Sequence, residues 1–253
     1  MSNWTRKLLS VGGVALVSTV CAASPVSGQG TWETTLHARD INGDGIADAY
    51  YDSAQNITWL ANWNVNGGDL PNAAGFMFWH EANIWATTLD VYGVTGWRLP
   101  RAVDLDSPGC NHSLAGGTDC GYNVALHASE LAHMYYATLG NLGICTPGDA
   151  VCSPFQSGWG LKNTANFLWT NTDWYWTDTF YDGQVGNAYW RFNMQGGHQS
   201  WATSLNVSKA VAVRDGDVFR AVPEPSTIGL VLLGLGAGLS VTLRPVRRWL
   251  RRS

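Results

Sequence analysis

Hydrophobic residues recur at helical spacing in two segments of the chain, residues 76–89 and residues 126–139. Apolar side chains three or four positions apart lie on one face of a helix, so each segment predicts a helix that packs on the core. Gly140 follows the second segment, where a glycine commonly ends a helix. The recurring positions are Phe78, Ala82, Trp85 and Leu89 in the first segment, and Leu131, Tyr135 and Leu139 in the second.

The last third of the chain alternates apolar and polar residues. Between Tyr189 and Met194 every second residue is large and apolar, and Gly196 and Gly197 then provide a turn. Alternating segments joined by tight turns favour an antiparallel sheet. The segments with strand character are residues 50–52, 57–60, 189–194 and 210–214.

An acidic, glycine-containing turn precedes the first of these strands. Asp40, Asn42 and Asp44 occupy positions 1, 3 and 5 of a calcium-binding loop, and Asp48 falls at position 9. Tyr51 stands at position 12, where such loops have a bidentate glutamate, and no helix signal flanks the segment. Calcium is therefore one interpretation, and the other is a solvated hairpin turn built on Asn-Gly-Asp-Gly.

The C-terminal segment, residues 222–253, has three parts. A Pro-Glu-Pro sequence comes first, an apolar run follows it, and five arginines then occur within nine positions. The run predicts a transmembrane helix over residues 226–243, which is only just long enough to span a bilayer. Because positive charge stays on the cytoplasmic side of a membrane, everything before Val222 is expected outside the cytoplasm.

This order resembles the PEP-CTERM sorting signal of Gram-negative bacteria. The resemblance implies an exported protein that a membrane peptidase of the exosortase type cuts near Pro223, Glu224 and Pro225. It also implies transient anchoring in the inner membrane, followed by release of the ectodomain to the cell surface or the medium. An ordinary tail anchor is the alternative interpretation.

The N-terminus has the layout of a secretory signal peptide. Arg6 and Lys7 precede an apolar stretch, residues 8–23, and small residues follow it. Residues 1–29 are therefore predicted to direct the chain to the secretion translocon and to be removed. Residues 30–221 remain as one globular ectodomain, because their length suits a single core and no linker divides them.

The ectodomain is acidic. Residues 30–221 hold 8 Lys and Arg against 18 Asp and Glu, a net charge of −10, whereas basic residues at the two ends bring the whole chain to −4. An acidic surface argues against nucleic acid as a partner, because phosphates need basic side chains. It also disfavours a sulfated polyanion unless the surface holds a local basic patch.

Four cysteines lie in the ectodomain. An even number in an exported protein indicates disulfides, and the short separations favour Cys110 with Cys120 and Cys145 with Cys152, out of three possible connectivities. Each bridge would pin one loop. Zinc is the competing use of four cysteines, but the chain has no Cys-x-x-Cys knuckle.

Several short motifs occur in an order that resembles the Lcl C-terminal domain family, a group of exported bacterial domains of largely unknown function. Residues 96–100, followed by a late Val-Arg strand, are also similar to the formylglycine-generating enzyme and C-type-lectin-like group. The resemblance implies an α+β fold in which two helices flank twisted antiparallel strands, with long disulfide-pinned loops. The motifs are Tyr51-Asp52, Thr58-Trp59-Leu60, Gly96-Trp97-Arg98-Leu99-Pro100, Tyr175-Trp176-Thr177, residues 188–192 and residues 210–214.

The functional residues of those relatives do not occur in this chain. The formylglycine-generating enzymes use a late cysteine pair, but no cysteine follows Cys152. The Glu-Pro-Asn, Gln-Pro-Asp and Trp-Asn-Asp motifs of calcium-dependent lectins are also missing. The resemblance therefore implies a scaffold and leaves the function to be argued from the site.

Tryptophan is the most suggestive residue for function, since the ectodomain holds twelve of the 14 in the chain. Exposed aromatic rings stack on sugars, although tryptophan more often fills a core. Trp174, Trp176, Trp190 and Trp201 are the candidate sugar-binding residues. We therefore expect a binding or adhesion module for a polysaccharide or a surface partner, with no cofactor other than a possible calcium ion.

Enzyme signatures give little support to the alternative, a secreted oxidoreductase or hydrolase on a lectin-like scaffold. The chain has no nucleophile elbow, zincin helix, phosphate loop or dinucleotide fingerprint. Asp104 with Asp106, or Asp178 with Asp182, are the candidate catalytic carboxylate pairs, and acidic loops provide such pairs by chance. A non-catalytic role is the expectation.

Overall fold

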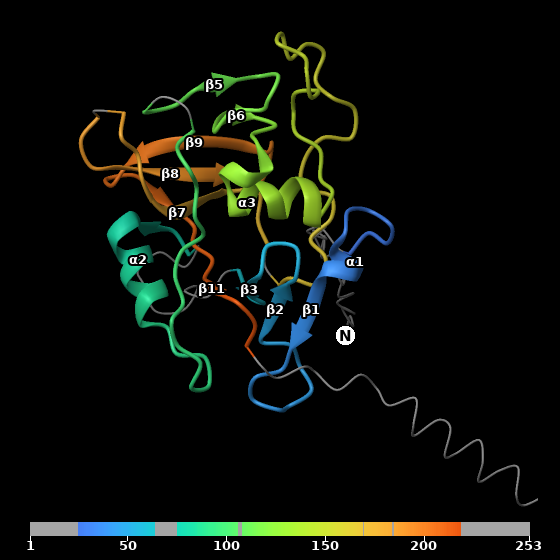
Figure 1. The fold of residues 1–253 in the computed structure, drawn as a ribbon, viewed down its shortest axis with the longest axis vertical. Coiled ribbons are helices and arrows are strands. Elements are labelled where there is room, and N and C mark those ends of the chain that lie inside the picture. Colours follow the sequence, from blue (N-terminus) through green and yellow to red (C-terminus); the bar gives the residue numbers. More distant parts are fainter. Residues whose placement is uncertain (1–24, 64–74, 106–107, 169, 184, 219–253) are drawn as a thin grey trace, which may run out of the picture.

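The computed structural model describes residues 25–63, 75–105, 108–168, 170–183 and 185–218, which are drawn in colour in Figure 1. The Pro-Glu-Pro sequence and the predicted transmembrane helix lie outside the described residues, and so does most of the predicted signal peptide. The described part of the predicted ectodomain contains two main sheets, which lie one above the other in the view of Figure 1.

The first sheet has the strand order β1-β2-β3-β11, and each neighbouring pair is antiparallel. All four residues of β3 are buried, so both faces of this strand are covered. Strands β2 and β3 confirm the predictions for residues 50–52 and 57–60. The bounds are Leu36–Arg39 for β1, Ala49–Asp52 for β2, Ile57–Leu60 for β3 and Val213–Asp215 for β11.

The strand predicted at residues 210–214 begins three residues later than expected. Lys209 exchanges backbone hydrogen bonds with β7 (Trp174–Phe180) of the second sheet, whereas the carbonyl of Ala212 accepts the N–H of Leu60 at 3.0 Å. The chain therefore crosses from one sheet to the other over these residues. Regular pairing with β3 starts only after that crossing.

The second sheet has the order β5-β6-β9-β8-β7, antiparallel throughout except for the parallel pair β5 and β6. Strand β8 confirms the alternation read from the sequence, and a tight turn leads from it into β9. An added Cβ at Gly197 in this turn would collide with the hydroxyl of Tyr136, so glycine is required there. The bounds are His112–Ser113 for β5, Cys120–Tyr122 for β6, Ala188–Asn193 for β8 and His198–Thr203 for β9.

The first predicted helix is shorter than the apolar pattern suggested. Helix α2 spans Trp79–Thr88, because the two residues before it form strand β4 (Met77–Phe78) and pair with β10 (Val207–Ser208). Glu81 accepts the N–H of Phe78 at 2.9 Å and so satisfies a backbone donor at the start of the helix. Phe78 itself is 37% exposed, so its predicted place on the core face is wrong.

The second predicted helix is divided into three pieces. A 3₁₀ turn over Leu126–Ala128 comes first, then α3 (Glu130–His133), then a π-helical turn over Met134–Thr138. Ser129 has an extended backbone because it forms a β-bridge with Ala102, and its hydroxyl caps α3 by accepting an N–H at 3.2 Å. A tertiary contact therefore overrides the helical pattern at this position.

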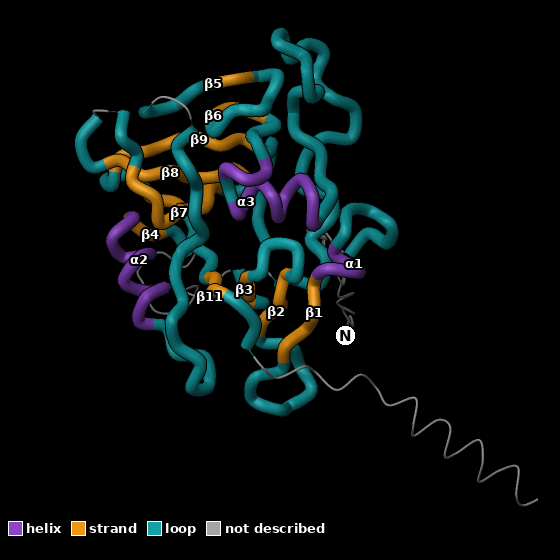
Figure 2. Tube along the Cα trace, in the orientation of Figure 1, coloured by secondary structure: helices purple, strands orange, loops and turns teal. Residues whose placement is uncertain are grey.

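Figure 2 shows that helices make up little of the molecule. One further short helix, α1 (Trp32–Thr35), precedes β1. The expected mixture of helices and antiparallel sheets is confirmed, and within the described residues strands and loops predominate over helices.

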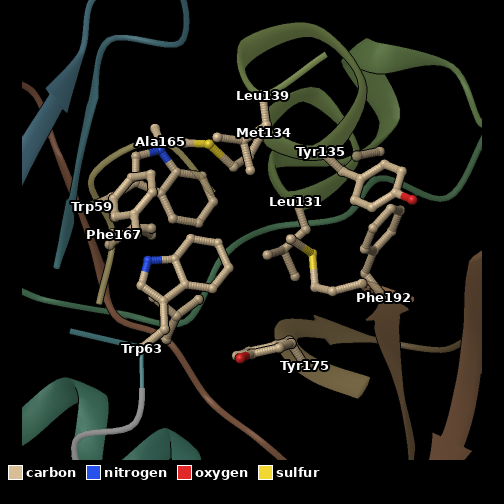
Figure 3. Packing of buried hydrophobic residues seen from close by; sticks show 14 of the residues in the cluster. Trp59, Trp63, Leu131, Met134, Tyr135, Leu139, Ala165, Phe167, Tyr175 and Phe192 are labelled. Carbon is tan, nitrogen blue, oxygen red and sulfur yellow. The ribbon is translucent and has the colours of Figure 1, made fainter. Parts of the chain in front are cut away.

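The main core lies between the two sheets and α3. Figure 3 shows Trp59 and Trp63 of the first sheet region facing Leu131 of α3, with Tyr175 and Phe192 of the second sheet on the far side. All five side chains are fully buried. Aromatic rings of this size bury large apolar areas, so this cluster stabilises the contact between the sheets.

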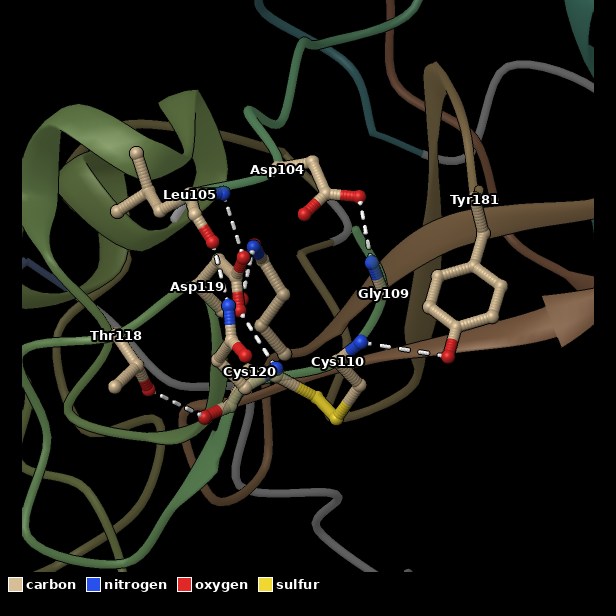
Figure 4. Close-up of a disulfide and its surroundings, with 10 residues drawn as sticks. Asp104, Leu105, Gly109, Cys110, Thr118, Asp119, Cys120 and Tyr181 are labelled. Atoms are coloured by element: carbon tan, nitrogen blue, oxygen red, sulfur yellow. Dashed lines mark hydrogen bonds between the residues drawn. A yellow bond between two sulfur atoms is a disulfide. The ribbon is translucent and has the colours of Figure 1, made fainter. Parts of the chain in front are cut away.

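Both predicted disulfides are confirmed. Cys110 pairs with Cys120, and Cys145 pairs with Cys152. Figure 4 shows that the first bridge is supported by Asp119, whose carboxylate accepts the N–H of Asn111 at 3.1 Å. The first bridge pins its loop to β6 of the second sheet, and the second closes the loop between residues 145 and 152.

Candidate ligand-binding groove

One face of the second sheet is only partly covered. Along β8 every second residue is buried, beginning with Ala188, and the residues between them are half-buried. The half-buried residues point to the face opposite the core. At one end of this face, Trp79 of α2 stacks on Tyr189 with ring centroids 3.5 Å apart. The other end of the face is hollowed.

Four side chains form a row across that hollowed end. Tyr122 on β6, His198 on β9, Asn193 on β8 and Trp174 on β7 are partners in the strand register. Residues directly opposite one another point to the same face of a sheet. The ring of His198 stacks on Tyr122 with centroids 4.7 Å apart and meets Trp174 edge to face at 5.4 Å.

This row lines a hollow of about 300 Å³, and a second hollow of about 450 Å³ shares Trp159 and Gln195 with it. We call the two hollows together the aromatic groove. Its lining combines aromatic rings with amide, hydroxyl and ammonium groups. The residues are Tyr122, Ile144, Gly158, Trp159, Gly160, Leu161, Lys162, Thr172, Trp174, Asn193, Gln195, Gly196 and His198.

The loop that carries Trp159 forms the outer wall of the groove and is tied to the sheet. The disulfide between Cys145 and Cys152 closes part of this loop. Ile144 donates its N–H to the carbonyl of Gly196 at 3.0 Å and so joins the loop to the turn between β8 and β9. A wall held in this way loses little conformational entropy when a ligand binds.

His198 is an uncharged group within the groove. Burial, together with Coulombic repulsion from His112 and Arg191, lowers the pKa of His198 to about 4, so the ring is neutral at pH 7. Its Nε2 atom is buried and has no hydrogen-bond partner among the described residues. An orphaned buried polar atom of this kind destabilises the folded protein.

Arg191 lies against the ring of Trp174, with its guanidinium carbon 4.2 Å from the ring centroid. Its Nη1 reaches the hydroxyl of Ser208 at 3.4 Å, and its buried Nε has no hydrogen-bond partner within the described ranges. Burial lowers the pKa of Arg191. The guanidinium therefore packs on Trp174 and adds positive charge beside the groove.

The four tryptophans proposed from the sequence do not form one surface. Trp174 is half-buried and lines the groove. Trp176 and Trp190 are fully buried. Trp201 faces Trp190 across the strands, on the core side of the sheet, and stacks on Tyr181 at 4.8 Å. The prediction that these tryptophans share one ligand-binding surface is therefore wrong. Trp176 and Trp190 are buried, and Trp201 lies on the other face of the sheet.

The Asp-rich turn forms the hairpin loop between β1 and β2, which confirms the hairpin interpretation. The carboxylate of Asp40 accepts three backbone N–H groups of the turn at 2.6 to 3.1 Å, and that of Asp48 accepts two. In the part of the chain that the structure describes, no group of three or more His, Cys, Asp or Glu side chains is arranged to hold a metal ion. Calcium bound by Asp40, Asn42, Asp44 and Asp48 stays a prediction.

The motif over residues 96–100 takes part in a network of charged side chains. Arg98 donates to both carboxylate oxygens of Glu130 at 2.8 Å and also pairs with Asp215 of β11. Glu130 further accepts the N–H of Arg101 at 2.7 Å. The network joins this motif to α3 and to the first sheet, so these carboxylates act as structural partners.

The candidate catalytic pair of Asp178 and Asp182 does not line the groove. Asp178 pairs with Arg101 at 3.5 Å, and Asp182 does not line the groove. Asp104 accepts the N–H of Gly109 at 3.0 Å, as Figure 4 shows, whereas its proposed partner at position 106 lies outside the described residues.

The sequence held a weak signal for part of the groove. The alternation at residues 189–194 separates Arg191 and Asn193 from the apolar side chains of the core, which marks them as the other face. Tyr122 and Trp159 carried no such signal. They come from segments far apart in the chain and meet only through strand pairing and a disulfide-closed loop.

The comparisons with known proteins identify the C-terminal segment. A family model of the PEP-CTERM protein-sorting motif matches residues 221–248, which include Pro223, Glu224 and Pro225, so this prediction is confirmed. No curated protein and no solved structure matches the chain. The motif marks an exported, surface-directed protein. More particularly, it marks a substrate that an exosortase processes.

The predicted membrane helix over residues 226–243 lies outside the described residues. Within those residues, none of the helices has the length and apolar character needed to cross a membrane.

Proposed function

We propose that the ectodomain is a binding or adhesion module and that the aromatic groove binds a polysaccharide outside the cell. The observation that carries this proposal is the row of Tyr122, His198, Asn193 and Trp174, bordered by Trp159. A sugar ring has apolar C–H faces that stack on aromatic rings and hydroxyls that need hydrogen-bond partners. The groove offers both kinds of contact in one place.

The sorting motif supports an extracellular ligand. A protein that is exported and processed by an exosortase meets the polysaccharides and proteins of the cell surface, and the groove lies on the exported body. We also propose that a signal peptide is removed, that the C-terminal helix anchors the chain transiently, and that cleavage then releases the ectodomain.

Binding is better supported than sugar hydrolysis. Glycosidases use a pair of carboxylic acids that flank the bond to be cut. Of the residues that the structure describes, no Asp or Glu side chain lines either hollow of the groove. The absence of carboxylates in the lining favours a ligand that is held rather than cleaved.

The scaffold is a second part of the proposal. We propose that the body is a divergent relative of the Lcl C-terminal and C-type-lectin-like domains. Trp97 and Leu99 of the shared motif are almost fully buried, and Arg98 between them links α3 to β11. This structural role supports the likeness, and superposition of an experimental structure on lectin-like domains would test it.

A glycan array probed with the exported, processed protein tests the function. The informative variant is Trp174→Ala, and Trp201→Ala is the matched control because it removes a half-buried tryptophan from the opposite face of the same sheet. An aromatic anchor in the centre of a site is worth more than about 1.4 kcal/mol, so Trp174→Ala is expected to weaken binding by more than about tenfold.

Thermal unfolding of each variant separates loss of binding from loss of the fold. Retained affinity in Trp174→Ala, or an equal loss of affinity in Trp201→Ala at equal stability, would contradict the assignment of the groove. If the folded wild-type protein binds no polysaccharide on the array, the proposed function itself is refuted.

A further inference from the structure

The lining of the aromatic groove is opposite in charge to the ectodomain around it. The ectodomain holds 18 Asp and Glu against 8 Lys and Arg, so a randomly placed hollow would be bordered by carboxylates. Among the described residues the groove has none in its lining, and the charged side chain that lines it is Lys162. The charge pattern therefore selects this groove as a place for a negative group.

The basic side chains of the groove are also the ones left without acidic partners. Arg39, Arg98, Arg101 and Lys209 each form an ion pair with a carboxylate. Among the described Lys and Arg residues, the ones outside any ion pair are Lys162, Arg191 and Arg214. Of these three, Lys162 lines the groove, where a ligand can supply the missing negative charge, and Arg191 lies against the ring of Trp174.

The position of Arg191 also changes the electrostatic potential at the ring of Trp174. The face of an aromatic ring carries partial negative charge and repels an anion. A guanidinium 4.2 Å from the centroid of Trp174 offsets that charge. Trp174 can therefore stack on the C–H face of a sugar that carries an acidic substituent, with less repulsion than an isolated tryptophan would cause.

We propose that the aromatic groove selects a carboxylate-bearing polysaccharide, a polymer that contains uronic acid units, over a neutral one. This inference rests on the proposed function and names the ligand class of the same site. Lys162 contacts the carboxylate, Arg191 provides the supporting positive charge, and Trp174 and Trp159 stack on the sugar rings. Gln195 accepts or donates hydrogen bonds to the hydroxyls, and the ring of His198 holds Tyr122 and Trp174 in the same row.

The matched pair of probes is an oligogalacturonate of six units and the same oligosaccharide after chemical reduction of its carboxyl groups. Both have the same length and linkage, so they differ only in the acidic groups. Isothermal titration calorimetry with the exported, processed protein is expected to show binding of the acid at least about tenfold tighter than binding of its reduced form. The preference is expected to shrink when salt rises from about 50 to 300 mM.

The variant that tests the contact is Lys162→Gln. Lys162 is exposed and forms no ion pair within the described residues, so the substitution leaves the fold intact. The expected result is a loss of about threefold to tenfold in affinity for the acid and no change for the reduced form. Lys209→Gln, which removes an already paired lysine, is the control and keeps the preference if the variant melts as the wild type does.

The outcomes separate this inference from the function on which it rests. Equal affinity for the two probes leaves the groove as a sugar site and overturns the preference for acidic units. Binding of neither probe, together with a silent glycan array, overturns the proposed function and this inference with it. An acid preference that Lys162→Gln does not reduce overturns the placement of the carboxylate at the groove.

Discussion

Replacing His198 with phenylalanine is predicted to remove a pH-dependent loss of stability. In the folded protein the half-buried ring has its pKa lowered to about 4, from an ordinary value of about 6.5. The unfolded chain keeps the ordinary value and therefore binds an extra proton between these two pH values. Stability due to this group falls as the pH drops below about 6.5, and the loss is complete near pH 4.

The size of the effect follows from the shift. At about pH 5 the linkage relation gives a loss of about 2 kcal/mol for a shift of this size. Because part of the ring is exposed, solvent screens this effect. We therefore expect a loss in free energy of unfolding of about half that value, about 1 kcal/mol. For a domain of this size, about 1 kcal/mol corresponds to a change of about 2–4 °C in Tm.

Thermal unfolding followed by circular dichroism at about pH 7.5 and pH 5, at constant ionic strength, measures the difference. His198→Phe keeps an aromatic ring against Tyr122 but cannot bind the proton, and His127→Phe, at an exposed position, is the matched control. Burial raises the pKa values of Asp119 and Asp178, and these groups act alike in all three proteins. The comparison therefore isolates His198.

The wild type and His127→Phe are expected to lose about 2–4 °C more than His198→Phe between the two pH values. Equal pH dependence in the wild type and His198→Phe would refute the reasoning, since it would mean that the ring exchanges protons with water in the folded protein as freely as in the unfolded one.

Four further predictions test other parts of the molecule. Glu130→Gln is expected to lower the free energy of unfolding by about 2 kcal/mol in chemical denaturation, because it removes the bidentate one of the two carboxylates that pair with half-buried Arg98; an unchanged midpoint would contradict the network. Replacing Cys145 and Cys152 by alanine is expected to cost about 2 kcal/mol and to weaken sugar binding, measured by calorimetry. If the Asp-rich turn binds calcium, adding calcium is expected to raise Tm, EDTA to reverse the rise, and Asp44→Asn to abolish it. An unchanged Tm would refute calcium binding at this turn. Processing at the sorting motif predicts a released form without residues 244–252, and mass spectrometry that finds only the full-length tail would count against it.

The local sequence predicted those elements whose residues interact with near neighbours. The alternation at residues 189–194 became β8, the Asp-rich turn became a hairpin loop, and the short cysteine separations gave the correct pairing. In each case the interaction is closed within about ten residues, so the pattern is visible in one stretch of chain. The sorting motif over residues 221–248 is likewise a local signal.

Predictions failed where backbone groups of a predicted helix pair instead with a segment far away in the chain. The helical pattern at residues 126–139 was interrupted because Ser129 pairs with Ala102 as a β-bridge. The start of the first helix was displaced because Phe78 pairs with Val207. Neither partner can be read from the spacing of apolar residues, since strand pairing depends on which segments the fold brings together.

Sequence alone indicated that this protein is exported and surface-directed, since the sorting motif is a short linear segment. It also determined the acidic character of the body and its two disulfides. Only the tertiary structure decided which aromatic residues are available to a ligand. It buried Trp176 and Trp190, left Trp174 on the open face, and brought Tyr122 and His198 beside it, because burial and strand register depend on contacts between segments far apart in the chain.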